Sequence, residues 1–146
     1  MNKFLQLLGT GNPIFVDCKP AQGVLTRLEE VVPDAVFVDI DWASHSIPSF
    51  YNMLKANKDK TIVLVTGGLF GLDDGEAVKR YTPMIYDMMR DDKTVDADDC
   101  SDKFVFTGKL IIHTYNIGAV PPGMLASGYT LTAEGLHQFT QEEVAA

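Results

Sequence analysis

Short apolar runs alternate along this chain with segments in which apolar residues recur every three or four positions. The runs are typical of strands buried on both faces, and the spaced pattern is typical of helices that cover a sheet. Strands are predicted at residues 13–18, 34–42 and 61–66 and, as one strand broken at Gly108 or as two, at 104–116. Helices are predicted at residues 2–8, 24–32, 46–56 and 82–89, and after Thr132 and Thr140. This alternation predicts a three-layer α/β/α fold with a mostly parallel sheet.

Two carboxylates follow the apolar run within residues 34–42, which we predict to be the strand around which the chain is organised. They are Asp39 and Asp41, and the i, i+2 spacing places both side chains on one side of the strand's carboxyl end. Open α/β sheets bind their ligands at that end, and carboxylate oxygens suit Mg²⁺. The alternative is that one carboxylate caps the following turn while the other faces solvent.

Asn116 ends another apolar strand. If that strand lies beside the one ending at Asp39, the Asn116 amide reaches the same crevice and can orient a water or a phosphate oxygen. The alternative is an asparagine that terminates a strand in an ordinary turn. The glycine-rich segments at residues 9–12 and 66–68 fit neither the P-loop nor the dinucleotide-binding pattern, so ordinary turns are favoured there.

Composition narrows the choice of partners and of compartment. The chain has 146 residues and is 46% hydrophobic, enough for one domain over residues 1–146, with an acidic loop insertion at about 91–102. The net charge of −8 argues against direct binding of nucleic acid, because nothing offsets repulsion by the phosphates. Two cysteines cannot build a disulfide framework, and no stretch approaches the roughly 20 apolar residues of a membrane span. A soluble, cytoplasmic protein is therefore expected.

Two stretches taken together resemble the ATPase core of the AAA+ type, particularly its compact phage-like members. Residues 35–39 are similar to a Walker B strand, and residues 104–116 are similar to the family's sensor strand, with Asn116 at the polar sensor position. Residues 120–128 resemble the segment in which these proteins place a Ser-Arg-Gly finger. The resemblance covers roughly residues 13–130.

The resemblance implies a P-loop-NTPase-like fold, ATP and Mg²⁺ as cofactors, and activity within a homo-oligomer. It implies that Asp39 and Asp41 organise Mg²⁺ and water and that Asn116 senses the terminal phosphate. The chain lacks a Walker A motif, since residues 2–8 would be the end of the helix after a P-loop, and Ile40 stands in the place of the catalytic glutamate. An incomplete or degenerate ATPase core is therefore expected.

The organising strand and the strand at residues 61–67 are also similar to the first two motifs of haloacid-dehalogenase-type phosphatases. There, Asp39 would be the nucleophile, Asp41 the general acid and Thr66 a phosphate ligand. A receiver-like binding module without catalytic activity, with Asp39 as acceptor, is a third alternative. The ATPase interpretation predicts that the strand ending at Asn116 lies beside the one ending at Asp39. The other two predict that the strand ending at Thr66 lies there instead.

Overall fold

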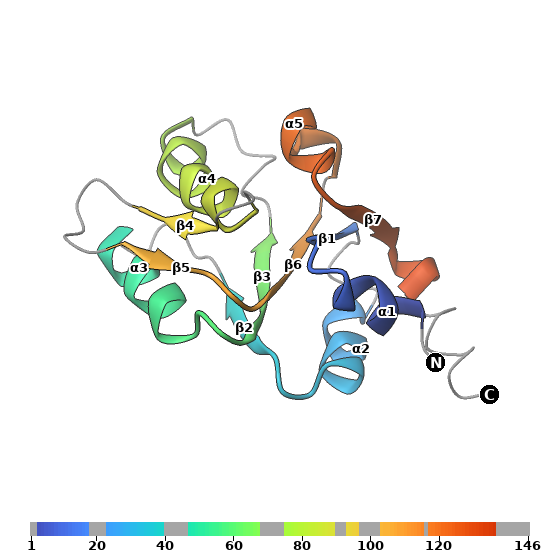
Figure 1. The fold of residues 1–146 in the computed structure, drawn as a ribbon. Helices are drawn as coiled ribbons and strands as arrows, with labels where there is room; N and C mark the ends of the chain where they lie inside the picture. Colours follow the sequence, from blue (N-terminus) through green and yellow to red (C-terminus); the bar gives the residue numbers. More distant parts are fainter. Residues whose placement is uncertain are drawn as a thin grey trace.

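The computed structural model describes residues 3–17, 23–39, 47–67, 75–89, 93–96, 103–115 and 117–136 (Figure 1). In these residues five strands form an all-parallel sheet in the order β2-β3-β6-β1-β7, with helices on both faces, which confirms the predicted α/β class. The elements are α1 (Lys3–Gly9), β1 (Ile14–Asp17), α2 (Val24–Val31), β2 (Val36–Asp39), α3 (Ile47–Ala56), β3 (Thr61–Gly67), α4 (Gly75–Met89), β4 (Thr94–Val95), β5 (Phe104–Val105), β6 (Lys109–Thr114), the 3-10 helix η3 (Ile117–Ala119), α5 (Pro122–Leu125) and β7 (Tyr129–Thr132).

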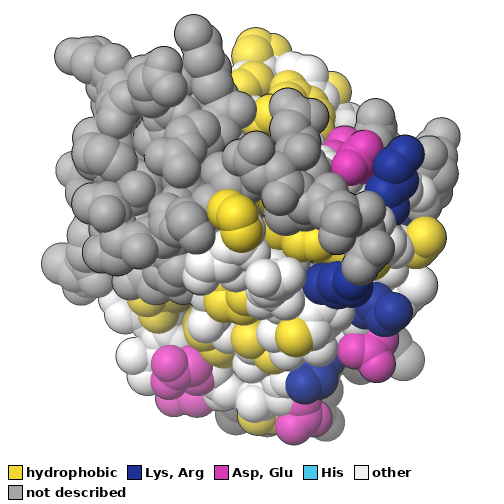
Figure 2. All heavy atoms as spheres, turned by 90° about the vertical axis from the view of Figure 1, so that its left-hand side faces the viewer, with side chains coloured by type: hydrophobic (Ala, Val, Ile, Leu, Met, Phe, Trp, Pro, Cys, Tyr) yellow, Lys and Arg dark blue, Asp and Glu magenta, His cyan; other side chains and the backbone are white. Residues whose placement is uncertain are grey.

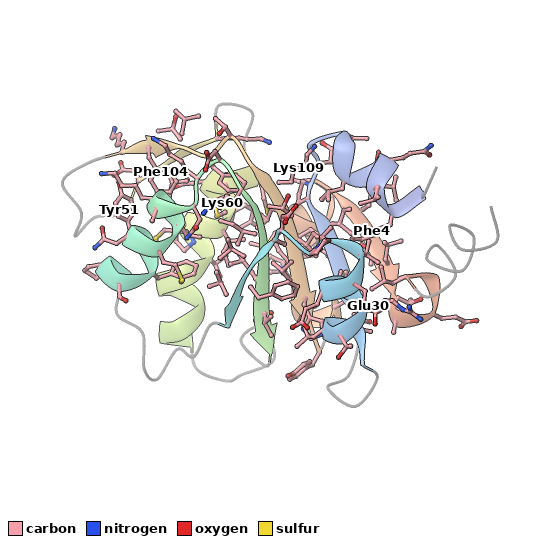
Figure 3. All side chains as sticks on the ribbon, turned by 90° about the horizontal axis from the view of Figure 1, so that it is seen from below. Phe4, Glu30, Tyr51, Lys60, Phe104 and Lys109 are labelled. Carbon is pink, nitrogen blue, oxygen red and sulfur yellow. The ribbon has the colours of Figure 1, made fainter. Side chains whose placement is uncertain are left out.

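Alternate residues of each strand point to opposite faces of the sheet and build two separate cores. In β3, Ile62 and Leu64 belong to the core formed with α3, α4 and α5, whereas Val63 and Val65 belong to the core formed with α1 and α2. Figures 1 and 3 show α3 and α4 on one side of the sheet and α1 and α2 on the other. Burial on both faces explains why the strands appear in the sequence as continuous apolar runs.

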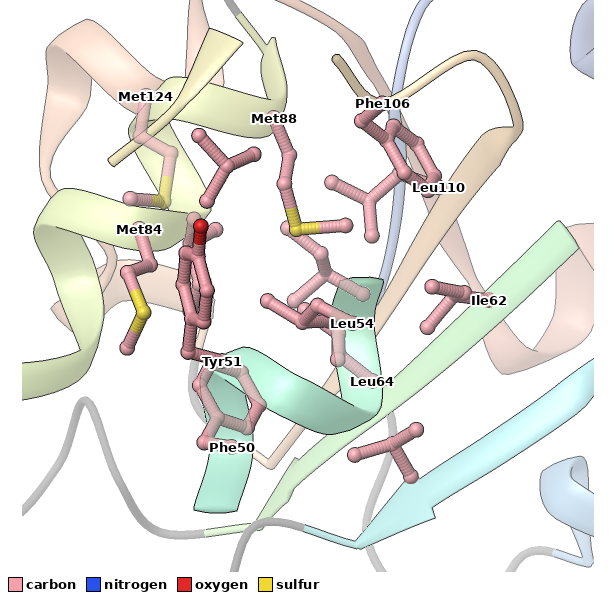
Figure 4. Packing of buried hydrophobic residues seen from close by; sticks show 14 of the residues in the cluster. Phe50, Tyr51, Leu54, Ile62, Leu64, Met84, Met88, Phe106, Leu110 and Met124 are labelled. Carbon is pink, nitrogen blue, oxygen red and sulfur yellow. The ribbon is translucent and has the colours of Figure 1, made fainter. Parts of the chain in front are cut away.

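The core beneath α3, α4 and α5 is rich in methionine (Figure 4). Met84 and Met88 from α4 and Met124 from α5 are almost fully buried there, beside Phe50 and Leu54 from α3. Unbranched methionine side chains adapt to irregular spaces, which suits a junction of three helices with the sheet.

Lys60 directly precedes β3 and Lys109 begins β6, so both lie at the amino ends of neighbouring strands (Figure 3). On the face shown in Figure 2, the basic side chains are scattered among acidic and apolar ones. Lys109 at the start of β6 donates a hydrogen bond to the Leu8 carbonyl (3.1 Å) in the last turn of α1. Lys93 donates to the Gly11 carbonyl (3.3 Å) just before β1. A cation near the carbonyl end of a helix is favourable, so these contacts help to hold α1, which at 7 residues would be marginal alone.

The strand that ends at Asp39 does not organise the sheet. β2 pairs only with β3 and forms one edge, and its residues Val36 and Phe37 are only half-buried, whereas Val38 is buried. The prediction that the chain is organised around this strand was therefore wrong. Burial on both faces is found in part, since Val38 lies in the core of α3, α4 and α5 and the half-buried Phe37 packs against the core of α1 and α2. The residues of this strand are nevertheless apolar, because helices pack on both faces of an edge strand in a three-layer fold.

Residues 104–116 contain two strands, one of the two alternatives left open by the sequence. β5 pairs with β4 in a small antiparallel sheet, and β6 joins the main sheet. Gly108 separates them at a close backbone contact, where a Cβ atom would lie 1.9 Å from the Lys60 carbonyl oxygen. Within residues 91–102, where a solvated acidic loop was expected, the structure describes residues 93–96. There Thr94 and Val95 form β4 instead of a loop, and Val95 is completely buried.

Two further expectations are settled by the helices. α4 begins at Gly75 rather than with Thr82 as its cap, so Pro83 lies inside the helix, where the burial of Met84, Ile85 and Met88 offsets one lost backbone hydrogen bond. Thr132 acts as the predicted cap, since its hydroxyl accepts a hydrogen bond from the Gly135 amide (3.2 Å). No helix in the described ranges combines the length and the apolar character needed to cross a membrane.

Candidate functional site

The sheet has a topological switch point between β1 and β6. The chain leaves β1 toward α2, whose Val24 and Leu28 pack in one core. It leaves β6 toward η3 and α5, whose Met124 packs in the core on the opposite face. When adjacent parallel strands send their connections to opposite faces, a crevice opens between their carboxyl ends, and ligands of open α/β sheets bind in it.

Polar side chains end both strands that flank this switch point. Asp17 is the last residue of β1 and is aligned with Thr114, the last residue of β6. By alternation from Phe15 and Ile112, both of which lie in the core of α3, α4 and α5, Asp17 and Thr114 belong to the same face of the sheet. Asp17 is half-buried and Thr114 is fully buried. The switch point therefore carries a carboxylate next to a hydroxyl.

The sequence-predicted site residues lie mostly outside the described residues. This holds for Asp41 and Asn116, and for the side chain of Asp39. The backbone of Asp39 is aligned with Val65 of β3, and β3 separates β2 from β6. Because neighbouring strands are about 4.8 Å apart, the strand ends that lead to Asp39 and to Asn116 are about 10 Å apart across the sheet. The neighbouring position that the ATPase interpretation predicted for them is therefore wrong. The strand that contains Thr66 lies beside the one ending at Asp39, as the phosphatase and receiver interpretations predicted.

Thr66 lies in a β-bulge at the carboxyl end of β3. Val65 is aligned with His113 and Gly67 with Thr114, which leaves Thr66 as the extra residue between them. Its hydroxyl donates a hydrogen bond to the His113 carbonyl (3.0 Å), and the side chain is only 2% exposed. The hydroxyl therefore ties the end of β3 to the end of β6, next to the switch point, where bulges often re-aim strand ends.

His113 is buried in β6 and directly precedes Thr114, the last residue of that strand. Its ring meets the exposed Tyr115 ring edge-on, with the centroids 5.6 Å apart. Burial lowers the pKa of His113 below its ordinary value, because the charged imidazolium is poorly solvated there, and a backbone hydrogen bond opposes this shift only in part. The imidazole of His113 is therefore buried in its neutral form, which is typical of a histidine in a protein core.

We expect the free energy of unfolding to fall as the pH is lowered through about 6.5. In that range the unfolded chain binds a proton at His113 while the folded protein resists it, so stability rises with pH and is fully present above the unfolded pKa. Urea unfolding at a series of pH values from 5 to 8 measures this slope. In His113→Gln the slope should be smaller, because the substitution removes the contribution of His113; an unchanged slope would contradict the assignment.

Sequence reasoning missed Asp17 and Thr114. The signal was available in part, because β1 and β2 both end in Phe-Val-Asp, at residues 15–17 and 37–39. What the sequence lacks is the strand order, which makes the first of these aspartates a neighbour of the switch point and moves the second to the edge.

Among the described residues, no group of three His, Cys, Asp or Glu side chains is placed to hold a metal ion. Comparisons with protein-family models and with curated protein sequences found no match for this chain.

Proposed function

We propose that this chain is an incomplete or degenerate AAA+-like ATPase core that binds a nucleoside triphosphate at the carboxyl ends of β1 and β6. The observation that supports this most is the position of the β1–α2 unit. P-loop proteins hold phosphates between a strand and the helix that follows it, and here such a strand–loop–helix unit stands at the switch point. Asn116 follows the neighbouring strand β6 and is the proposed sensor of the terminal phosphate.

This placement changes one part of the sequence interpretation. α1 precedes β1, so the helix that corresponds to the one after a P-loop is α2 and not the segment at residues 2–8. The connecting residues 17–23 are Asp-Cys-Lys-Pro-Ala-Gln-Gly and contain a lysine, but not the Gly-Lys-Ser/Thr ending of a Walker A motif. Pro20 has no amide N–H to offer a phosphate. Weak binding and slow or absent hydrolysis are the expected consequences.

Thermal unfolding in the presence of ATP and Mg²⁺ tests the proposal. A ligand that binds the folded protein raises its stability by RT ln(1 + [L]/Kd), about 1.4 kcal/mol at a concentration tenfold above Kd. We expect Asn116→Ala to reduce the shift and Asp39→Asn to leave it unchanged, since Asp39 ends the edge strand. No shift at millimolar ATP would contradict the proposal. Loss of the shift in Asp39→Asn alone would move the site to the Asp39–Asp41 pair.

A phosphatase or a receiver-like module is the second candidate, and one observation favours it. β2 lies beside β3, so the strand ending at Asp39 is next to the strand that contains Thr66. The buried Thr66 hydroxyl is already used in a hydrogen bond to β6, which makes it a poor phosphate ligand. This candidate predicts hydrolysis of a generic phosphomonoester that Asp39→Asn abolishes, or, for a receiver-like module, neither hydrolysis nor an ATP-dependent shift.

A further inference from the structure

We propose that Asp17 provides the protein carboxylate for a divalent cation, Mg²⁺, that accompanies the nucleotide at the β1–β6 crevice. The inference rests on the proposed function and places the metal ligand at the switch point, away from the Asp39–Asp41 pair. Mg²⁺ suits this position because it keeps several waters and is commonly held by one or two carboxylates together with substrate phosphates. One aspartate at the end of the crevice is therefore a sufficient protein contribution.

The first argument is placement. Asp17 and Thr114 end adjacent strands in register and belong to the same face, so their Cα atoms are separated by about one strand spacing, about 4.8 Å. A cation bound to the Asp17 carboxylate would therefore lie at the carboxyl ends of both strands. In the sequence, Asn116 follows two residues after Thr114.

The second argument is the lack of a compensating charge at Asp17. Within the described part of the chain, the Asp17 carboxylate makes no hydrogen bond or ion pair, although it is half-buried. A carboxylate that is partly removed from water is stabilised by a bound cation more than an exposed one is. A ligand that carries positive charge is thus favoured at this strand end.

The third argument is the distribution of cations. The lysines that can be placed lie toward the amino ends of the strands, where Lys109 and Lys93 bind the carbonyls of Leu8 and Gly11. Arg27 of α2, on the other face, is paired with Glu30 (2.9 Å). Over the described ranges, then, none of these side chains neutralises a triphosphate beside Asp17. Lys19 lies outside the described residues. A bound Mg²⁺ would add positive charge beside the Asp17 carboxylate.

Calorimetric titration with ATP, with and without Mg²⁺, tests the assignment. For the wild-type protein we expect Mg²⁺ to strengthen ATP binding about tenfold. In Asp17→Asn this strengthening should be lost, while Mg²⁺-free ATP should bind as well or better, because one repulsive charge is removed. Asp34→Asn is the matched control: Asp34 is exposed, precedes β2 at the amino end of the sheet, and should leave both affinities unchanged. Retention of the Mg²⁺ effect in Asp17→Asn, or equal loss of binding with and without Mg²⁺, would overturn the proposal.

A titration with Mn²⁺ alone separates this inference from the proposed function. Binding of Mn²⁺ removes the electron paramagnetic resonance signal of the free ion, and we expect weak binding that Asp17→Asn abolishes and Asp34→Asn does not. A second measurement uses the wild-type protein alone. In it, Mn²⁺ should broaden the amide NMR signals of Asp17 and Thr114 at lower concentrations than the amide signal of Asp34. If ATP fails to bind but both Mn²⁺ results hold, the cation site stands and the nucleotide proposal falls. If Mn²⁺ binds elsewhere or not at all, the cation site falls whatever ATP does.

Discussion

Gly108→Ala is expected to destabilise the domain by about 3 kcal/mol or more, near the upper end of what overpacking costs. Gly108 is buried between β5 and β6, and an added Cβ would lie 1.9 Å from the carbonyl oxygen of Lys60 and 2.7 Å from its carbonyl carbon. These atoms belong to the backbone and cannot rotate away. The turn at Lys58 and Lys60 would have to separate from the strand, with loss of the hydrogen bonds that Thr107 and Gly108 donate to the Lys58 carbonyl (2.8 and 2.9 Å).

Urea unfolding followed by circular dichroism measures this loss, with Gly123→Ala as the control. A Cβ at Gly123 would meet only the Tyr86 hydroxyl at 3.6 Å, an ordinary contact, and alanine favours the α5 helix. That variant should therefore remain within about 0.5 kcal/mol of the wild-type protein. A Gly108→Ala protein as stable as Gly123→Ala would show that β3 and β6 are not joined by so close a backbone contact.

Phe15→Ala is expected to cost about 3–5 kcal/mol, whereas Phe37→Ala should cost clearly less. The two phenylalanines occupy equivalent places in the sequence, each two residues before the aspartate that ends a strand. Phe15 lies in β1 between two neighbouring strands and is completely buried in the core of α3, α4 and α5. Phe37 lies in the edge strand β2 and is only half-buried, so a smaller apolar area returns to water on truncation.

The difference between the two free energies of unfolding tests the strand order directly. Both proteins carry the same chemical change, so effects on the unfolded chain largely cancel. Equal costs, or a larger cost for Phe37→Ala, would contradict the edge position of β2 and restore the organising role that the sequence indicated for it.

Several elements could be predicted from local pattern because local physics decides them. The helix at Ile47–Ala56 follows from apolar residues at helical spacing, and the strand at Thr61–Gly67 follows from a run of β-branched and apolar residues. The cap at Thr132 follows from the capacity of its hydroxyl to accept a hydrogen bond from a nearby amide. The start of α4 was missed, because burial of the methionines in its second half outweighs the local signal of Thr82 and Pro83.

The candidate site could not be predicted from the sequence as well as these helices and strands could. Two strands end in Phe-Val-Asp, and nothing in either run shows which neighbours it will have. The second was chosen because Asp41 follows Asp39 at a spacing that suits a metal ion. In the fold, the chain crosses from β1 to the far edge and then returns through β3 and β6, which puts the first aspartate at the switch point. Such pairing depends on contacts between residues far apart in the chain.

The class of this protein follows from its sequence, because apolar runs bounded by turns and separated by amphipathic segments can bury their surface only in a layered α/β domain. The sequence also places an aspartate directly after two of the apolar runs, at residues 17 and 39. Which polar residues become neighbours depends on the fold, because the order of strands in a parallel sheet is set by crossover connections and by packing across both faces. For that reason Asp17 and Thr114 stand together at the switch point, and Asp39 stands at the edge.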